Sequence, residues 1–90
     1  MEEYTDPKTV YRKYQRLYKN KNIKPSTRKN KKYMVLDPNT NKWVHFGQIP
    51  YEDFTKHKDP IRRMKYHSRM GRFKEAYKYS PGYLSLVLLW

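Results

Sequence analysis

Apolar side chains near the start of the chain follow a helical period. Five of them recur at helical spacing, namely Val10, Tyr11, Tyr14, Leu17 and Tyr18. Asp6-Pro7, just before them, has the pattern of an N-cap residue followed by proline at the first helical position. The pattern predicts an amphipathic helix over residues 7–20, whose other face is basic. The simplest interpretation of that basic face is a solvated helix surface.

The next segments change from polar to β-prone. Residues 20–32 have almost no apolar content, and Pro25 excludes a continuous helix, so they are interpreted as a basic arm. Residues 33–36 and 43–46 then flank a turn cluster at 37–42, which predicts a hairpin. A period of two groups the residues of the hairpin as Met34, Leu36, Val44 and Phe46 against Tyr33, Val35, Trp43 and His45. Because an isolated hairpin is marginally stable, a helix is expected to cover it.

Two further cap-plus-proline signals divide the C-terminal half. One or two helical turns are expected within 51–57, before Asp59-Pro60 opens a helix over 60–70 that ends near Gly71. Ile61, Met64 and Ser68 share one face of that helix. No element is predicted for 72–79, and Ser80-Pro81 opens a short apolar helix that runs toward Trp90.

Together these elements predict a small single-domain α+β fold. A hairpin is packed by short helices within residues 33–90, and residues 1–32 form a basic N-terminal helix and arm. A chain of 90 residues buries only about 60–65% of its unfolded surface, so its own core supplies modest stability.

Charge points to the class of partner. The formal net charge is +13, and between Asp6 and Asp37 there are eleven Lys or Arg residues and no acid. Such a chain favours nucleic acid as its partner, bound through phosphates without base readout. The candidate binding residues are Arg12, Lys13, Arg16, Lys19, Lys21, Lys24, Arg28, Lys29, Lys31, Lys32, Arg62, Arg63, Lys65 and Arg69.

Two patterns have a structural alternative. Acids and bases alternate in residues 53–63, so Asp53 and Asp59 are expected to cap helices and to pair with Arg62 or Arg63; the functional alternative is a phosphate clamp on one helix. The tyrosines near the N-terminus lie at helical spacing. Tyrosines with this spacing belong to a helix core more often than they form a platform on which unpaired bases stack.

Catalysis, metals and cofactors are not indicated. The chain has no cysteine, and His45, His57 and His67 are dispersed without a carboxylate at ligand spacing, so no metal site is predicted. Without a nucleophile beside a base, or a Gly-rich phosphate loop, the protein is interpreted as non-enzymatic, and no cofactor is expected. No signal peptide is visible, and the apolar run from Tyr83 to Trp90 is too short to span a bilayer; a secreted or membrane protein is not expected.

The residues 32–47 and 51–59, with Arg62-Arg63, Ser80-Pro81 and Leu88-Leu89-Trp90, resemble an uncharacterised family of small basic proteins encoded by large double-stranded DNA viruses. The resemblance covers about residues 28–90. It implies a viral source, with a location in the virion or in the viral factory of the host cytoplasm. The resemblance then implies genome binding as one function, with DNA favoured over RNA as the partner. Its alternative is a minor structural protein that binds acidic capsid surfaces.

The C-terminal tail separates these two functions. Under the alternative, the tail docks on another virion protein through Tyr83, Leu84, Val87, Leu88 and Trp90. A tail buried in the chain's own core favours genome binding, whereas an exposed apolar tail favours a protein partner. The oligomeric state is left open.

Overall fold

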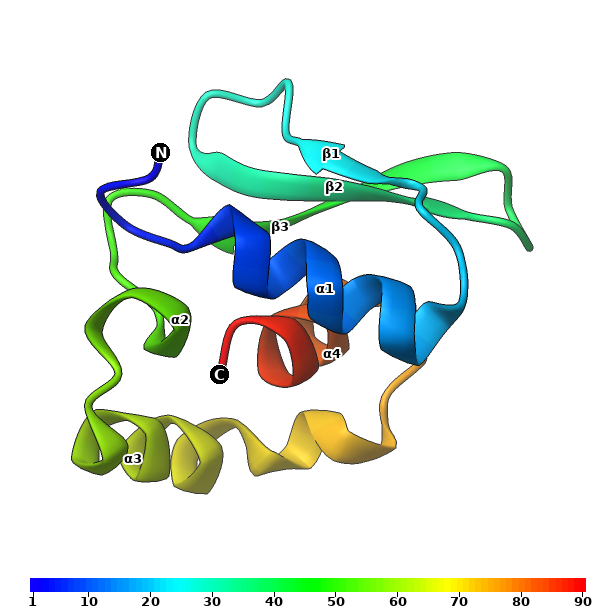
Figure 1. Ribbon diagram of the computed structural model, residues 1–90. Helices are drawn as coiled ribbons and strands as arrows, with labels where there is room; N and C mark the ends of the chain where they lie inside the picture. The colour runs from blue at the N-terminus through cyan, green and yellow to red at the C-terminus, as the bar shows by residue number, and fades with distance from the viewer.

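The computed structural model describes residues 1–90, and Figure 1 shows a sheet on one side, helices α1 and α4 beneath it, and helix α3 farther below. The elements follow in the order α1 (Pro7–Tyr18), β1 (Ile23–Pro25), β2 (Lys31–Asp37), β3 (Lys42–Gln48), α2 (Phe54–His57), α3 (Pro60–Met70), the 3₁₀ helix η1 (Gly71–Glu75) and α4 (Pro81–Leu88). The predicted α+β class is confirmed. None of the helices is both long and apolar enough to cross a membrane.

The sheet is antiparallel, with strand order β1-β2-β3. The predicted hairpin is β2–β3, but the predicted assignment of its residues to the two faces was wrong. Tyr33 pairs with Phe46 and Val35 with Val44, so these four residues share one face, and Met34, Leu36, Trp43 and His45 share the other. The physical reason is the turn, because Asp37 pairs with Lys42 across four loop residues, and the predicted grouping requires an odd number.

The core lies between the inner face of the sheet and helices α1 and α4. Its fully buried residues are Val10 and Tyr14 of α1, Tyr33, Val35 and Phe46 of the sheet, and Leu84 and Leu88 of α4, with Tyr79 and Leu89 almost as deep. Aromatic rings fill much of this space; Tyr14, for example, stacks on Tyr18 at 4.8 Å between centroids. Residues of α1 and of the hairpin thus belong to one hydrophobic core.

The helix starts confirm the cap-plus-proline signals. The Asp59 carboxylate accepts hydrogen bonds from the backbone N–H groups of Ile61 and Arg62, and the Ser80 hydroxyl accepts one from Tyr83. Asp6 differs, since it caps no backbone N–H and accepts a hydrogen bond from the Thr9 hydroxyl at 2.9 Å instead.

One predicted segment needs correction, and one confirmed helix is more exposed than most. Within residues 20–32, Ile23–Pro25 pair with β2 as a short edge strand, where proline is tolerated because no partner is needed on the outer side. Helix α3 does not bury its apolar face, since Ile61 is 59% and Met64 65% exposed. The helix nevertheless ends at Met70 with Gly71 as its C-cap, as predicted, and η1 follows directly because Gly71 keeps a right-handed helical conformation.

Candidate nucleic-acid interface

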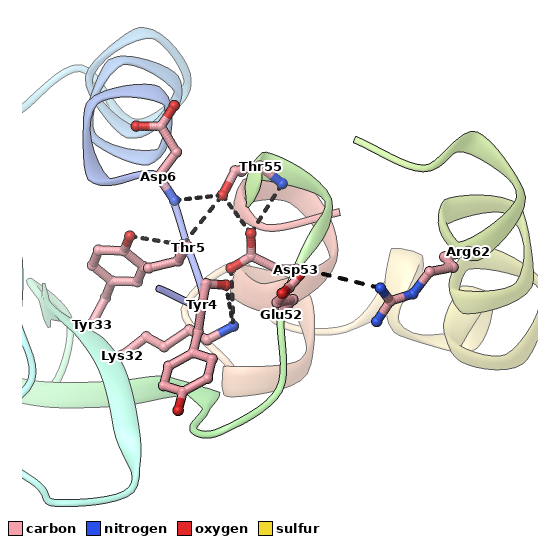
Figure 2. Close-up of polar contacts among 9 residues, drawn as sticks. All are labelled: Tyr4, Thr5, Asp6, Lys32, Tyr33, Glu52, Asp53, Thr55 and Arg62. Atoms are coloured by element: carbon pink, nitrogen blue, oxygen red, sulfur yellow. Dashed lines mark hydrogen bonds and ion pairs between the residues drawn. The ribbon is translucent and has the colours of Figure 1, made fainter. Parts of the chain in front are cut away.

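A buried ion pair joins three segments that are far apart in the sequence. Lys32 leaves β2 and directs its ammonium to the Asp53 carboxylate at 3.1 Å and to the Tyr4 carbonyl at 3.3 Å (Figure 2). The other carboxylate oxygen of Asp53 accepts hydrogen bonds from the backbone N–H and the hydroxyl of Thr55 at the start of α2. Thr5 connects this group to the core through the Tyr33 hydroxyl at 2.9 Å.

This pair removes Lys32 from the candidate binding residues. Its side chain is 2% exposed, and burial lowers its pKa, although the charge of Asp53 opposes that shift. The prediction that Asp53 pairs with Arg62 or Arg63 was also wrong. Arg62 instead lies 4.0 Å from Glu52 on the surface (Figure 2), where such a pair contributes little.

Basic side chains from three elements line a cavity of about 360 Å³, here called the basic groove. Lys13 and Arg16 come from α1, Arg63 and His67 from α3, and Lys74 from η1. Arg63 and His67 are four residues apart, so they project from the same face of α3. Leu86, Val87 and Trp90 complete the lining.

The basic groove has no acidic lining residue. Burial lowers the pKa of Lys13, and the nearby positive charge of Arg63 lowers it further. The Arg63 Nε–H donates to the Trp90 carbonyl at 2.6 Å, which fixes the guanidinium at one end. His67 Nε2 is buried without a hydrogen-bond partner. The groove therefore gathers positive charges without an acidic side chain beside them, together with a buried His67 nitrogen that has no hydrogen-bond partner.

A second cavity, of about 580 Å³, lies between α3 and the end of the β2–β3 hairpin and is here called the α3 cleft. Lys31, Arg62, Lys65 and Arg69 line it, with Glu52 as its one acid. Aromatic rings also contribute, namely Tyr51, Tyr66, Phe73 and Trp90, together with buried Phe46. Tyr66 stacks on Trp90 with 4.3 Å between centroids. Helix α3 thus supplies basic side chains to both cavities, to the basic groove and to the α3 cleft.

The structure disperses the remaining predicted bases over the surface. Lys24 lies over the Trp43 ring at 4.4 Å, and Lys19 ends α1 in the left-handed conformation. Arg12, Lys21, Arg28 and Lys29 are exposed. Only Lys32 and Arg62, among 21 Lys and Arg residues, have an acidic side chain within 4.0 Å. Most of the positive charge therefore has no acidic partner within the chain.

The predicted docking tail is largely internal. Leu84 and Leu88 are fully buried, and Tyr83, Val87 and Trp90 are partly buried. The three histidines lie apart: His45 shares a 2.7 Å hydrogen bond with Ser26, and His57 Nδ1 accepts one from the Asp59 backbone. No group of three or more His, Asp or Glu side chains is arranged to hold a metal ion.

Sequence reasoning missed several lining residues. Lys74 falls in 72–79, for which no element was predicted, and His67 was not among the candidate binding residues. Tyr51, Tyr66 and Phe73 carried no recognisable signal, because their partners lie on other elements. The four-residue spacing of Arg63 and His67 was the one usable indication of a shared face.

Residues 21–70 match the model of a family of unknown function, DUF5754. The match includes the sheet, α2 and α3, and with them the Lys32–Asp53 pair, while α1, η1 and α4 lie outside it. No curated protein and no solved structure matches the chain. Because the family model covers more than half of the 90 residues, the chain belongs to the DUF5754 family.

Proposed function

We propose that this protein binds nucleic acid through phosphate contacts, without reading the base sequence, and that the basic groove is its principal contact. One observation carries the proposal: five basic side chains from α1, α3 and η1 line one groove without an acid among them. Phosphate oxygens are the natural partners of clustered lysine and arginine side chains.

The energetics of the groove support an anionic partner. Like charges at close range destabilise a folded chain unless a counter-charge is present. Burial is the main cause that lowers the pKa of Lys13, and the nearby positive charge of Arg63 lowers it further. A phosphate between α1 and α3 would place a counter-charge beside Lys13 and Arg63, and it could accept a hydrogen bond from a ring N–H of His67.

The buried tail argues against the alternative in which α4 docks on an acidic capsid protein. Leu84 and Leu88 are already used by the chain's own core, so releasing them would expose core residues. The resemblance to basic proteins of large double-stranded DNA viruses suggests which nucleic acid the protein meets. We therefore propose the viral genome as the physiological partner, in the virion or viral factory, with no catalytic step.

The test is a salt series of binding to a fluorescent DNA duplex. Affinity should fall by about 10³-fold or more between roughly 50 and 200 mM salt, as expected for six or more phosphate contacts. The groove variant Lys13→Gln/Lys74→Gln should lower the slope of log K against log salt by about 2, since each lost phosphate contact removes about 0.9.

The matched control is Lys42→Gln/Lys56→Gln. It removes the same charge from two exposed lysines that line neither cavity. Its slope should stay near that of the unaltered protein. Equal slopes for the groove and control variants, or binding that does not respond to salt, would overturn the proposal.

A further inference from the structure

The α3 cleft combines two kinds of side chain that a nucleotide requires together. Lys31 enters from β2, and Lys65 and Arg69 enter from α3, four residues apart and therefore on one helix face. Aromatic rings share the same cavity. The basic groove, by contrast, has a single aromatic lining residue, Trp90, whose ring is already stacked on Tyr66.

Tyr51 is the aromatic side chain most open to a ligand. It lines the cleft and is 68% exposed, whereas Phe46, in the same lining, is fully buried. An exposed planar ring that lines a cavity offers a face on which a base can stack, whatever the identity of that base. The cleft's one carboxylate, Glu52, lies 4.0 Å from Arg62, so its charge is partly offset.

The size of the cleft also fits such a ligand. About 580 Å³ falls within the range of sites that enclose small molecules, roughly 300–1,000 Å³. A base inside a duplex is stacked on both faces and cannot reach Tyr51. An unpaired base can do so, while its flanking phosphates approach Lys31, Lys65 and Arg69, the lining cations that have no acidic side chain within 4.0 Å.

We infer that the α3 cleft binds one unpaired nucleotide, with the base stacked on Tyr51 and the phosphates held by Lys31, Lys65 and Arg69. The inference rests on the proposed function and extends it: the protein would prefer single-stranded nucleic acid, or the frayed end of a duplex, to a closed duplex.

The experiment compares three fluorescent ligands by anisotropy: a ten-nucleotide thymidine strand, an abasic strand with the same number of phosphates, and a closed hairpin duplex. Tyr51→Ala should weaken binding of the thymidine strand by about 5-fold or more, the range found for loss of one stacking contact. Binding of the abasic strand and of the duplex should not change. Tyr51→Phe keeps the ring and should retain the affinity of the unaltered protein.

The groove variant Lys13→Gln/Lys74→Gln separates this inference from the proposed function. It should weaken binding of the thymidine strand and of the duplex alike, because both ligands bring phosphates to the groove. If the duplex responds to that variant while Tyr51→Ala leaves the thymidine strand unaffected, the cleft inference is overturned and the proposed function stands. Equal affinity of the unaltered protein for the abasic and thymidine strands would also overturn it. If the unaltered protein binds none of the three ligands, both proposals are overturned.

Discussion

Removal of either partner of the buried Lys32–Asp53 pair should destabilise the fold far more than removal of a surface pair. Lys32→Met deletes the ammonium and leaves a carboxylate that is 1% exposed, held only by Thr55. Asp53→Asn leaves the ammonium with the Tyr4 carbonyl and an amide oxygen in place of a carboxylate.

The expected magnitude follows from this burial. Breaking a buried pair by removing one partner costs about 3–5 kcal/mol, because an uncompensated charge stays in the interior. For a domain of this size that is a large part of a total stability of roughly 5–15 kcal/mol. In Lys32→Met/Asp53→Asn neither charge remains, and the oxygen of the introduced side-chain amide can still accept from Thr55 N–H. The double variant should therefore lose about 2 kcal/mol less than the sum of the single losses.

The assay is urea denaturation followed by far-UV circular dichroism, applied to both single variants and the double variant. The control cycle uses Arg62→Met and Glu52→Gln, whose side chains are 51% and 42% exposed at a separation of 4.0 Å. Its coupling should stay below about 1 kcal/mol. Additive losses in the Lys32–Asp53 cycle, or single losses no larger than that of Arg62→Met, would refute the reasoning.

Three further outcomes are expected. Leu88→Ala should lower the free energy of unfolding by about 2–5 kcal/mol because the side chain is fully buried, whereas Met64→Ala on α3 should change it by less than about 0.5 kcal/mol; equal losses on urea denaturation would contradict this. Gly82→Ala should cost about 1–3 kcal/mol, since the added Cβ would lie 2.5 Å from the Phe73 ring, while Gly71→Ala meets nothing within 4 Å; melting temperatures that fall equally would contradict the contact. Burial raises the pKa of Tyr18 and Tyr33 above the usual value near 10, so their contribution to stability is full below about pH 10 and is lost as pH rises through the folded pKa. Tyrosinate absorbance should then rise together with unfolding, and free titration of all ten tyrosines near pH 10 in a folded protein would contradict the assignment.

Local signals predicted the elements well because they depend on adjacent residues. Asp59-Pro60 and Ser80-Pro81 mark true helix starts, and the turn cluster at 37–42 marks a true hairpin. The face on which each hairpin residue lies could not be predicted. A turn that is longer or shorter by one residue changes the register and so changes which residues of the two strands share a face. Strand β1 was missed since three residues that include Pro25 carry no strand period.

The candidate site was less predictable than the fold. Lys32 lies in the same basic run as its neighbours, so nothing in the local sequence distinguishes it from them. Its burial depends on Asp53, which is 21 residues away in the sequence. The basic groove likewise depends on how α3 and η1 lie against α1. Composition indicated an anionic partner, but only the tertiary arrangement shows which bases lie together.

Helix α3 contains no buried residue, although it supplies side chains to both the groove and the cleft. A helix held by so few core contacts should open at a lower free energy than the β2–β3 pair, as a separate cooperative unit. Its backbone amides should thus exchange with solvent sooner than those of Tyr33 and Val35. A polyanion that bridges α1 and α3 would slow that exchange, so hydrogen exchange along α3 reports occupancy without any label on the ligand.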